Sequence, residues 1–183
     1  IFSYQPPSQD GGGYQTQEYS TDPPSIPRAE TGTGVTLTLH PDKGETLTYT
    51  QIYDKCLPSM VSIEAISSST YSTGTGIVVT SDGYIVTNAH VVAGASQVRV
   101  ILWDNEVLDA SLVGFDAEED LAVLKIEAEG LTPAEFGDSS SLRIGDPVAA
   151  LGDPLGYRST ITDGIISALD REVEVDGVTM VLI

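Results

Sequence analysis

Hydrophobic and polar residues alternate along most of the chain after residue 60, and this pattern predicts β-strands. The runs GTGIVVT (74–80) and YIVT (84–87) flank the turn Ser81-Asp82-Gly83, a combination typical of a β-hairpin. Further runs of this kind are MVSIEAI, QVRVILW, VLDASLVG, DLAVLKIE, DPVAALG, RSTITDGIISAL, REVEV and VTMVLI. Because these strands are short and closely spaced, and helical periodicity is nearly absent, the sequence predicts an all-β antiparallel barrel or sandwich.

The first 59 residues follow other patterns. Residues 1–34 are rich in Gln, Ser, Gly, Pro and Thr, which predicts a flexible low-complexity linker. VTLTL (35–39) and TLTY (46–49) alternate around a turn at 40–44, and predict two short strands or an extended arm. Residues 49–57 are expected to form a short helix. We therefore divide the chain into a linker (1–34), an N-terminal arm (35–59), a first barrel (about 60–137) and part of a second barrel (about 138–183).

The net charge of the chain argues against nucleic acid as a binding partner. Eight basic residues against 27 acidic ones give a formal net charge of −19, which repels polyanions, so no nucleic acid partner is expected.

The single cysteine, Cys56, excludes an internal disulfide and is expected in the core. No run of about 18 apolar residues is present, so no transmembrane helix is predicted. The chain begins at Ile1, which we interpret as a sign that an upstream signal or membrane anchor has been removed.

Two residues at strand ends are candidates for acid–base chemistry. A serine hydrolase needs an imidazole that accepts the nucleophile's proton, and a carboxylate that fixes the tautomer of that imidazole. His90 follows the strand YIVT, and Asp120 opens the run DLAVLKI 30 residues later. Asp120 is preferred among the carboxylates of FDAEEDLAVL because it adjoins the apolar run, although Asp116, Glu118 and Glu119 remain alternatives. A lone histidine beside two valines is more often a packed core residue, so the residues alone leave that reading open.

Four longer segments carry a resemblance to a known family. GTGIVVTSDGYIVTNAHVV, DAEEDLAVLKI, FGDSSSLRIGDPVAALGDPLG and TITDGIISALDR, in this order, resemble the protease domain of the HtrA/DegP family of trypsin-like serine endopeptidases. The resemblance runs from about Thr48 to Ile183, which would make residues 35–183 a partial HtrA-like protease domain. It implies a trypsin-like double antiparallel β-barrel, with the first barrel complete and the second incomplete. It also implies that His90 is the general base and that Asp120 orients it.

The third member of the family's catalytic set is absent from the sequence. The family nucleophile lies in a GNSGGPL-type loop, whose backbone N–H groups form the oxyanion hole, and no such loop occurs here. Ser139, in GDSSS, is not followed by glycine and lies only 19 residues after Asp120, so it is not expected to be the nucleophile. The serine is expected beyond Ile183, and the chain alone is expected to be close to inactive. Trp103, at the end of QVRVILW, is expected to be a packed aromatic residue and not a platform for a ligand.

The resemblance leads to one main functional hypothesis and two others. The main one is a serine endopeptidase that hydrolyses unfolded or exposed protein segments, without a metal or another cofactor. The first alternative is a non-catalytic protease-fold module that binds extended peptides, and the second is a structural envelope protein tethered through residues 1–34. Family members commonly assemble as trimers and carry a C-terminal PDZ domain, so the resemblance implies a homotrimer. An extracytoplasmic location in a bacterial envelope, or secretion, is expected on the same basis.

Overall fold

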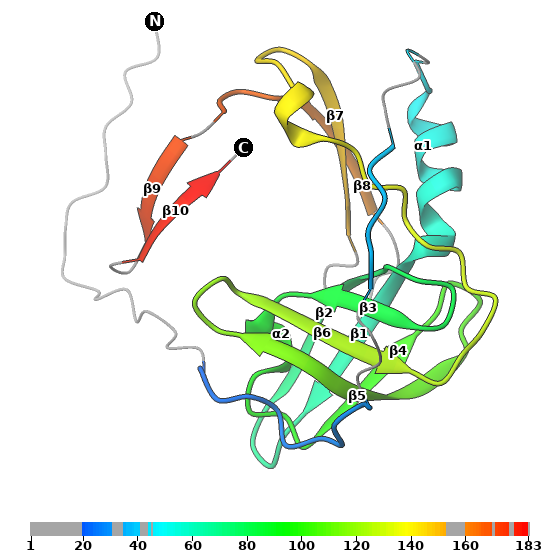
Figure 1. Cartoon of the computed structure of the whole chain (residues 1–183), viewed down its shortest axis with the longest axis vertical. Coiled ribbons are helices and arrows are strands. Elements are labelled where there is room, and N and C mark those ends of the chain that lie inside the picture. The colour runs from blue at the N-terminus through cyan, green and yellow to red at the C-terminus, as the bar shows by residue number, and fades with distance from the viewer. Residues whose placement is uncertain are drawn as a thin grey trace, which may run out of the picture.

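Six of the strands form a closed β-barrel, which occupies the lower part of the molecule in Figure 1. A computed structural model describes residues 20–30, 35–40, 44, 46–152, 160–169, 171–175 and 178–182. Six antiparallel strands form the barrel in the order β1-β2-β3-β6-β5-β4, and β4 pairs with β1 to close it. The strands are β1 (Met60–Ile66), β2 (Tyr71–Val78), β3 (Tyr84–Thr87), β4 (Gln97–Ile101), β5 (Val107–Asp116) and β6 (Leu121–Ile126). The predicted all-β class and complete first barrel are confirmed.

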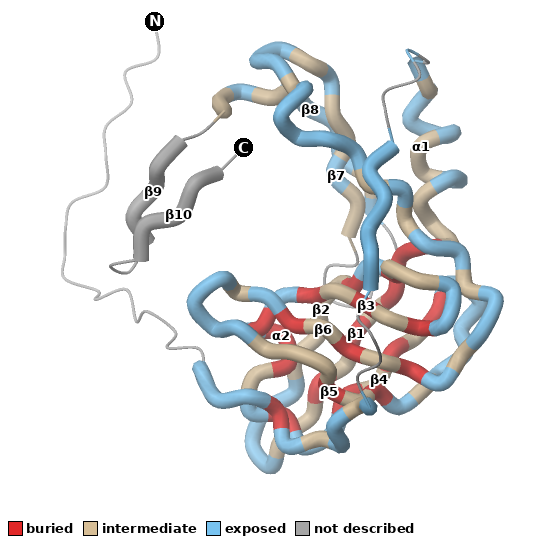
Figure 2. The backbone as a smooth tube through the Cα atoms, in the orientation of Figure 1, coloured by how far each residue is buried: buried red, intermediate tan, exposed pale blue. Residues whose placement is uncertain are grey.

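The barrel interior holds the hydrophobic core, as Figure 2 shows. Buried and more exposed positions alternate along β1, β4 and β6, because successive side chains of a strand point to opposite faces. Burial of each large aliphatic side chain stabilises the fold by roughly 1.5–3 kcal/mol. The largest side chains with almost no exposed surface are Ile63, Val78, Ile85, Val92, Val98, Val100, Leu112, Leu124 and Ile126. The alternating pattern of the sequence therefore encodes the barrel directly.

The hairpin between β2 and β3 turns where the sequence predicts it. Gly83 has a φ of +103°, a left-handed conformation that glycine adopts without a steric penalty. A Cβ at this position would also collide with the carbonyl oxygen of Ile126 in β6. The N–H of Gly83 donates to the carbonyl of Thr80 at 3.2 Å and closes the turn. The turn thereby brings β3 into pairing with β2 and delivers the chain to the end of the barrel.

The strands that follow the barrel form two separate pairs within the described residues. β7 (Pro147–Gly152) pairs with β8 (Thr160–Ile165), and β9 (Arg171–Val175) pairs with β10 (Val178–Leu182), all antiparallel. The β7–β8 pair stands beyond one end of the barrel, beside α1 (Figure 1). Two unjoined pairs agree with the expected incomplete second barrel.

The segment before the barrel contains one helix and an extended arm. Helix α1 (Tyr49–Cys56) confirms the predicted short helix and is followed by a 3-10 turn, η1 (Leu57–Ser59). The two-strand alternative for 35–39 and 46–49 is wrong, because residues 35–40 are extended and only Leu39 forms a bridge, to Phe136. None of the helices that the structure describes is long and apolar enough to cross a membrane.

Residues 20–30, which we call the N-terminal strap, lie against the barrel. The strap forms a parallel bridge to β5, where Leu112 N–H donates to Pro27 O at 2.8 Å and Ala29 N–H donates to Leu112 O at 3.0 Å. It also binds the chain just after α2 (Ala89–Val92), where Ser25 N–H donates to Ala95 O at 2.7 Å. Residues 1–19 and 31–34 lie outside the described residues, so the linker stays a prediction there.

Candidate active site

A four-residue helix, α2, presents His90 at the edge of the barrel. β3 ends at the buried Thr87, whose hydroxyl donates to the carbonyl of Thr75 in β2 at 2.8 Å and so anchors the exit of the strand. Within α2, Ala89, Val91 and Val92 are buried, while 44% of the His90 side chain is exposed. The valines after His90 therefore bury the helix and leave the imidazole at the surface. The core-residue interpretation of His90 is wrong.

A glycine allows α2 to sit this close to the barrel wall. Gly74 lies in β2 beneath Val91, and a Cβ at position 74 would be 2.6 Å from one γ-carbon of Val91 and 2.7 Å from the other. Carbon atoms normally approach no closer than about 3.5 Å. The absence of a side chain at Gly74 is therefore a condition for the observed position of α2, and of His90 with it.

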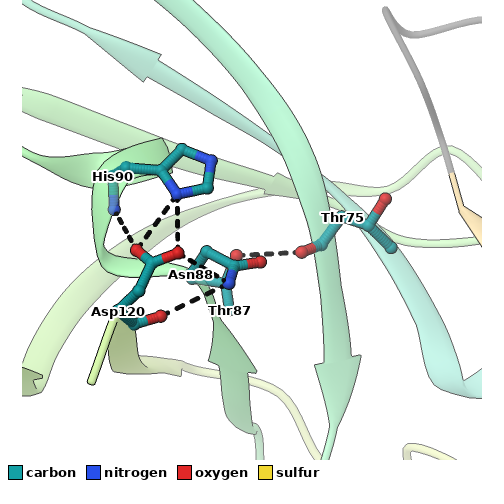
Figure 3. Close-up of polar contacts among 5 residues, drawn as sticks. All are labelled: Thr75, Thr87, Asn88, His90 and Asp120. Atoms are coloured by element: carbon teal, nitrogen blue, oxygen red, sulfur yellow. Dashed lines mark hydrogen bonds and ion pairs between the residues drawn. The ribbon is translucent and has the colours of Figure 1, made fainter. Parts of the chain in front are cut away.

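Asp120 reaches His90 from the turn between β5 and β6. Its backbone has a φ of +51°, a left-handed conformation that aspartate tolerates better than most residues. The carboxylate meets Nδ1 of His90 with both oxygens, at 2.8 Å for Oδ2 and 3.0 Å for Oδ1 (Figure 3). Oδ1 also accepts the backbone N–H of His90 at 2.9 Å, and the carbonyl of Asp120 accepts the N–H of Ala89 at 3.1 Å. The structure thus brings the two predicted site residues together.

The surroundings of Asp120 favour its charged form. Partial burial raises the pKa of the Asp120 carboxyl, but the hydrogen bonds donated by the backbone and ring of His90, together with the Asn88 amide, outweigh burial. Their net effect holds the pKa of Asp120 below its ordinary value. At neutral pH the site therefore offers a carboxylate that only accepts hydrogen bonds.

This arrangement fixes what the imidazole can do. Because the carboxylate is an acceptor, Nδ1 of a neutral His90 carries the proton, and Nε2 holds the lone pair. Figure 3 shows Nε2 on the side of the ring opposite Asp120. A half-exposed imidazole in this tautomer can take a proton from a hydroxyl group, and the carboxylate then stabilises the imidazolium that forms.

The other candidate residues lie in local turns. Asp116 accepts the backbone N–H groups of Glu118 and Glu119 at 3.0 and 3.1 Å, which makes the rest of the acidic segment a capped turn. Ser139 opens a 3-10 turn, η2 (Ser139–Ser141), in the yellow segment of Figure 1, at the far end of the molecule from α2. This location supports the expectation that Ser139 is not the nucleophile.

One contact of the site, and one residue outside the site, differ from the sequence-based predictions. Asn88 donates its side-chain amide to Asp120, although its position before a helix suggests an ordinary cap. Trp103 is 58% exposed in the turn between β4 and β5, so the prediction that it is a packed aromatic residue is wrong. Among the described residues, no group of three or more His, Cys, Asp or Glu side chains is placed to hold a metal ion.

Comparisons of the sequence identify proteins that are similar to this chain. The model of the family described as "Trypsin-like peptidase domain" matches residues 74–181. The chain is 50% identical over 102 residues to a protein of Hahella chejuensis, and 43% identical over 120 residues to one of Halomonas elongata. Both carry the name "Probable periplasmic serine endoprotease DegP-like". The matches cover 56% and 66% of this chain but only 22% and 25% of the two relatives.

Solved structures give the same picture. The HtrA-type protease AlgW with a tripeptide matches 68% of this chain at 38% identity, with a TM-score of 0.65. The serine endoprotease from Yersinia pestis matches the same share at 36% identity, with a TM-score of 0.63. The matches cover 41% and 46% of those two chains. This chain therefore corresponds to less than half of each solved relative.

Proposed function

Because the chain belongs to the trypsin-like peptidase domain family, as a domain of HtrA/DegP type, we propose that it supplies the acid–base half of a serine endopeptidase site. The contact of 2.8 Å between Nδ1 of His90 and Oδ2 of Asp120, with the imidazole half-exposed, is the observation that carries the proposal. The relatives above are named as endoproteases. Their names favour this proposal over the alternative of a non-catalytic module that binds peptides.

The proposed reaction is acyl transfer from a peptide bond. A serine hydroxyl attacks the carbonyl carbon while Nε2 of His90 takes the hydroxyl proton, and His90 then gives that proton to the departing amine. Asp120 holds the tautomer and stabilises the imidazolium, but does not take the proton itself. The 183 residues contain no Gly-x-Ser-Gly-Gly sequence, so the proposal assigns the serine to a part of the protein outside them.

The proposed substrates are unfolded or exposed protein segments, cut outside the cytoplasm. The names of the periplasmic relatives support this location. Assembly as a homotrimer remains a prediction from the family resemblance, and the N-terminal membrane anchor remains a separate prediction from the sequence. The division between a first barrel at about 60–137 and a second from about 138 is also part of the proposal.

The test uses protein expressed from the full reading frame that encodes this chain. We expect a serine-directed fluorophosphonate probe to label it, and unfolded casein to be cleaved. His90→Ala should abolish both, because loss of the base costs several orders of magnitude in rate. The chain's other histidine provides the control, since His40→Ala should leave both unchanged. Equal labelling of the protein and its His90→Ala variant would refute the proposal.

A further inference from the structure

Helix α2 is capped by Asp120 and not by the side chain of its own N-cap residue, Asn88. An asparagine at the N-cap ordinarily accepts a hydrogen bond from the N–H of the second or third helical residue. Asn88 occupies the N-cap of α2 and makes no such bond. The N–H groups of Ala89 and His90 donate instead to the carbonyl and to Oδ1 of Asp120, at 3.1 and 2.9 Å. Asp120 therefore caps α2 from a position 30 residues away.

The side chain of Asn88 is thereby available for another contact. Its Nδ2 donates to Oδ2 of Asp120 at 3.0 Å and to the Asp120 carbonyl at 3.3 Å (Figure 3). Both of these atoms are acceptors, so the amide presents its NH₂ group and not its oxygen. Oδ2 is also the atom that lies 2.8 Å from Nδ1 of His90.

We propose that Asn88 is a positioning residue, whose amide holds the Asp120 carboxylate in the orientation that aims Oδ2 at the imidazole of His90. The proposal rests on the proposed function of the pair, but it concerns geometry that is measurable without hydrolysis. Both carboxylate oxygens lie within reach of Nδ1 of His90, but Oδ1 is also held by the backbone N–H of His90, whereas Oδ2 is also held by the side chain of Asn88. Without Asn88, water competes for Oδ2, because 36% of the Asp120 side chain is exposed.

Two substitutions separate positioning from capping. Asn and Asp are about equally good N-cap residues and Ala is much poorer, so a capping role ranks Asn88→Asp near the unsubstituted protein and Asn88→Ala below it. A donor role gives the opposite order. Alanine only removes the donor, whereas an ionised aspartate accepts but cannot donate, and also places a second negative charge beside Asp120. Asn88→Asp should therefore disturb the pair more than Asn88→Ala does.

The readout is the tautomer of His90 in the ¹⁵N-labelled 183-residue chain. Long-range ¹H–¹⁵N correlation spectra at about pH 9, where an ordinary histidine is neutral, report the tautomer from the shifts of the two ring nitrogens. The chain has only two histidines, and His40 serves as the internal control. We expect the ratio of the Nδ1–H to the Nε2–H form to fall roughly five- to tenfold in Asn88→Ala, and further in Asn88→Asp. The signals of His40 should not move.

Two results would overturn the proposal. One is an unchanged His90 tautomer in folded Asn88→Ala. The other is a tautomer ratio that is unchanged in Asn88→Asp and falls only in Asn88→Ala, because a capping role of Asn88 would give this ranking of the two variants. Backbone amide spectra of each variant establish that it is folded, and if Asn88→Asp does not fold, Asn88→Ala alone decides. The proposed function fails separately, if the full-length protein is not labelled while these tautomer shifts occur as expected.

Discussion

Substitution of Gly74 by alanine tests whether close packing beneath α2 places His90. The new methyl carbon would lie 2.6 and 2.7 Å from the two γ-carbons of Val91, about 1 Å inside the normal contact distance. Val91 cannot rotate away cheaply, because a β-branched side chain in a helix has one strongly preferred rotamer. The helix must therefore move away from the barrel, or β2 must distort.

The expected cost follows from the geometry. Overpacking of this kind typically destabilises a protein by about 1–3 kcal/mol. Alanine at a strand position that it fits would instead gain roughly 0.4–1 kcal/mol by restricting the unfolded chain. The net destabilisation by Gly74→Ala should therefore be about 1–2 kcal/mol. Val91→Ala alone should cost about 2 kcal/mol, because it removes two buried methyl groups and leaves a cavity.

The double substitution distinguishes this mechanism from a general effect of alanine. In Gly74→Ala/Val91→Ala the new methyl group occupies space that the valine vacates, so the loss should be smaller than the sum of the single losses by about 1–2 kcal/mol. Urea denaturation, followed by circular dichroism, measures all three variants. Gly114→Ala is the matched control, because no atom lies within 4 Å of a Cβ at that strand position, and it should be neutral or slightly stabilising.

Additive losses in the double variant would refute this reasoning, and so would a Gly74→Ala protein as stable as the Gly114→Ala control. The imidazole signals of His90 provide a second check. They should change in Gly74→Ala, since α2 moves, and return toward their original positions in the double variant.

Two further predictions concern the charge of the site and the barrel core. Asp120→Asn should lower stability at pH 7 by less than about 1 kcal/mol, because the site is partly exposed. Since folding lowers the pKa of Asp120, its charged form stabilises the protein above the ordinary value near 3.9, and the difference between the two proteins in urea should shrink as the pH falls below about 4. A constant or growing difference would contradict the assigned direction of the shift. Ile85→Ala should cost about 2–5 kcal/mol in the same assay because Ile85 has no exposed surface, whereas Ile165→Ala, at a position 62% exposed, should change stability by less than about 0.5 kcal/mol.

The sequence predicts the barrel well because strand alternation is a local signal. In β4 the apolar Val98 and Val100 are buried and alternate with the polar Gln97 and Arg99, so the pattern identifies both the strand and its inner face. Errors occur where the pattern continues past the strand end. Trp103 ends an apolar run that continues from β4, but the chain has already entered the turn to β5. The strand alternative for residues 46–49 fails in a similar way, because Thr48 and Gln51 form a capping box that begins α1.

The site was predictable as a pair of residues but not as a network. Asp120 could be preferred over Asp116 because it adjoins an apolar run, and the structure brings it to His90. The contact of Asn88 with Asp120 could not be predicted, because it depends on the left-handed backbone at Asp120 and on two segments 32 residues apart. The docking of the N-terminal strap could not be predicted either, since it combines backbone hydrogen bonds, which leave no side-chain pattern in the sequence, with the packing of a single apolar side chain, Ile26, against the core.

The N-terminal strap has a mechanical consequence. Its bonds lie at two places, next to Gly94 and Ala95 directly after α2, and along β5 at Leu112. A pull on the chain upstream of residue 20 therefore loads the bond from Gly94 N–H to Asp22 O first, then the bond between Ser25 and Ala95, and only afterwards those at β5. Tension would thus reach the end of the helix that carries His90 before any barrel strand separates.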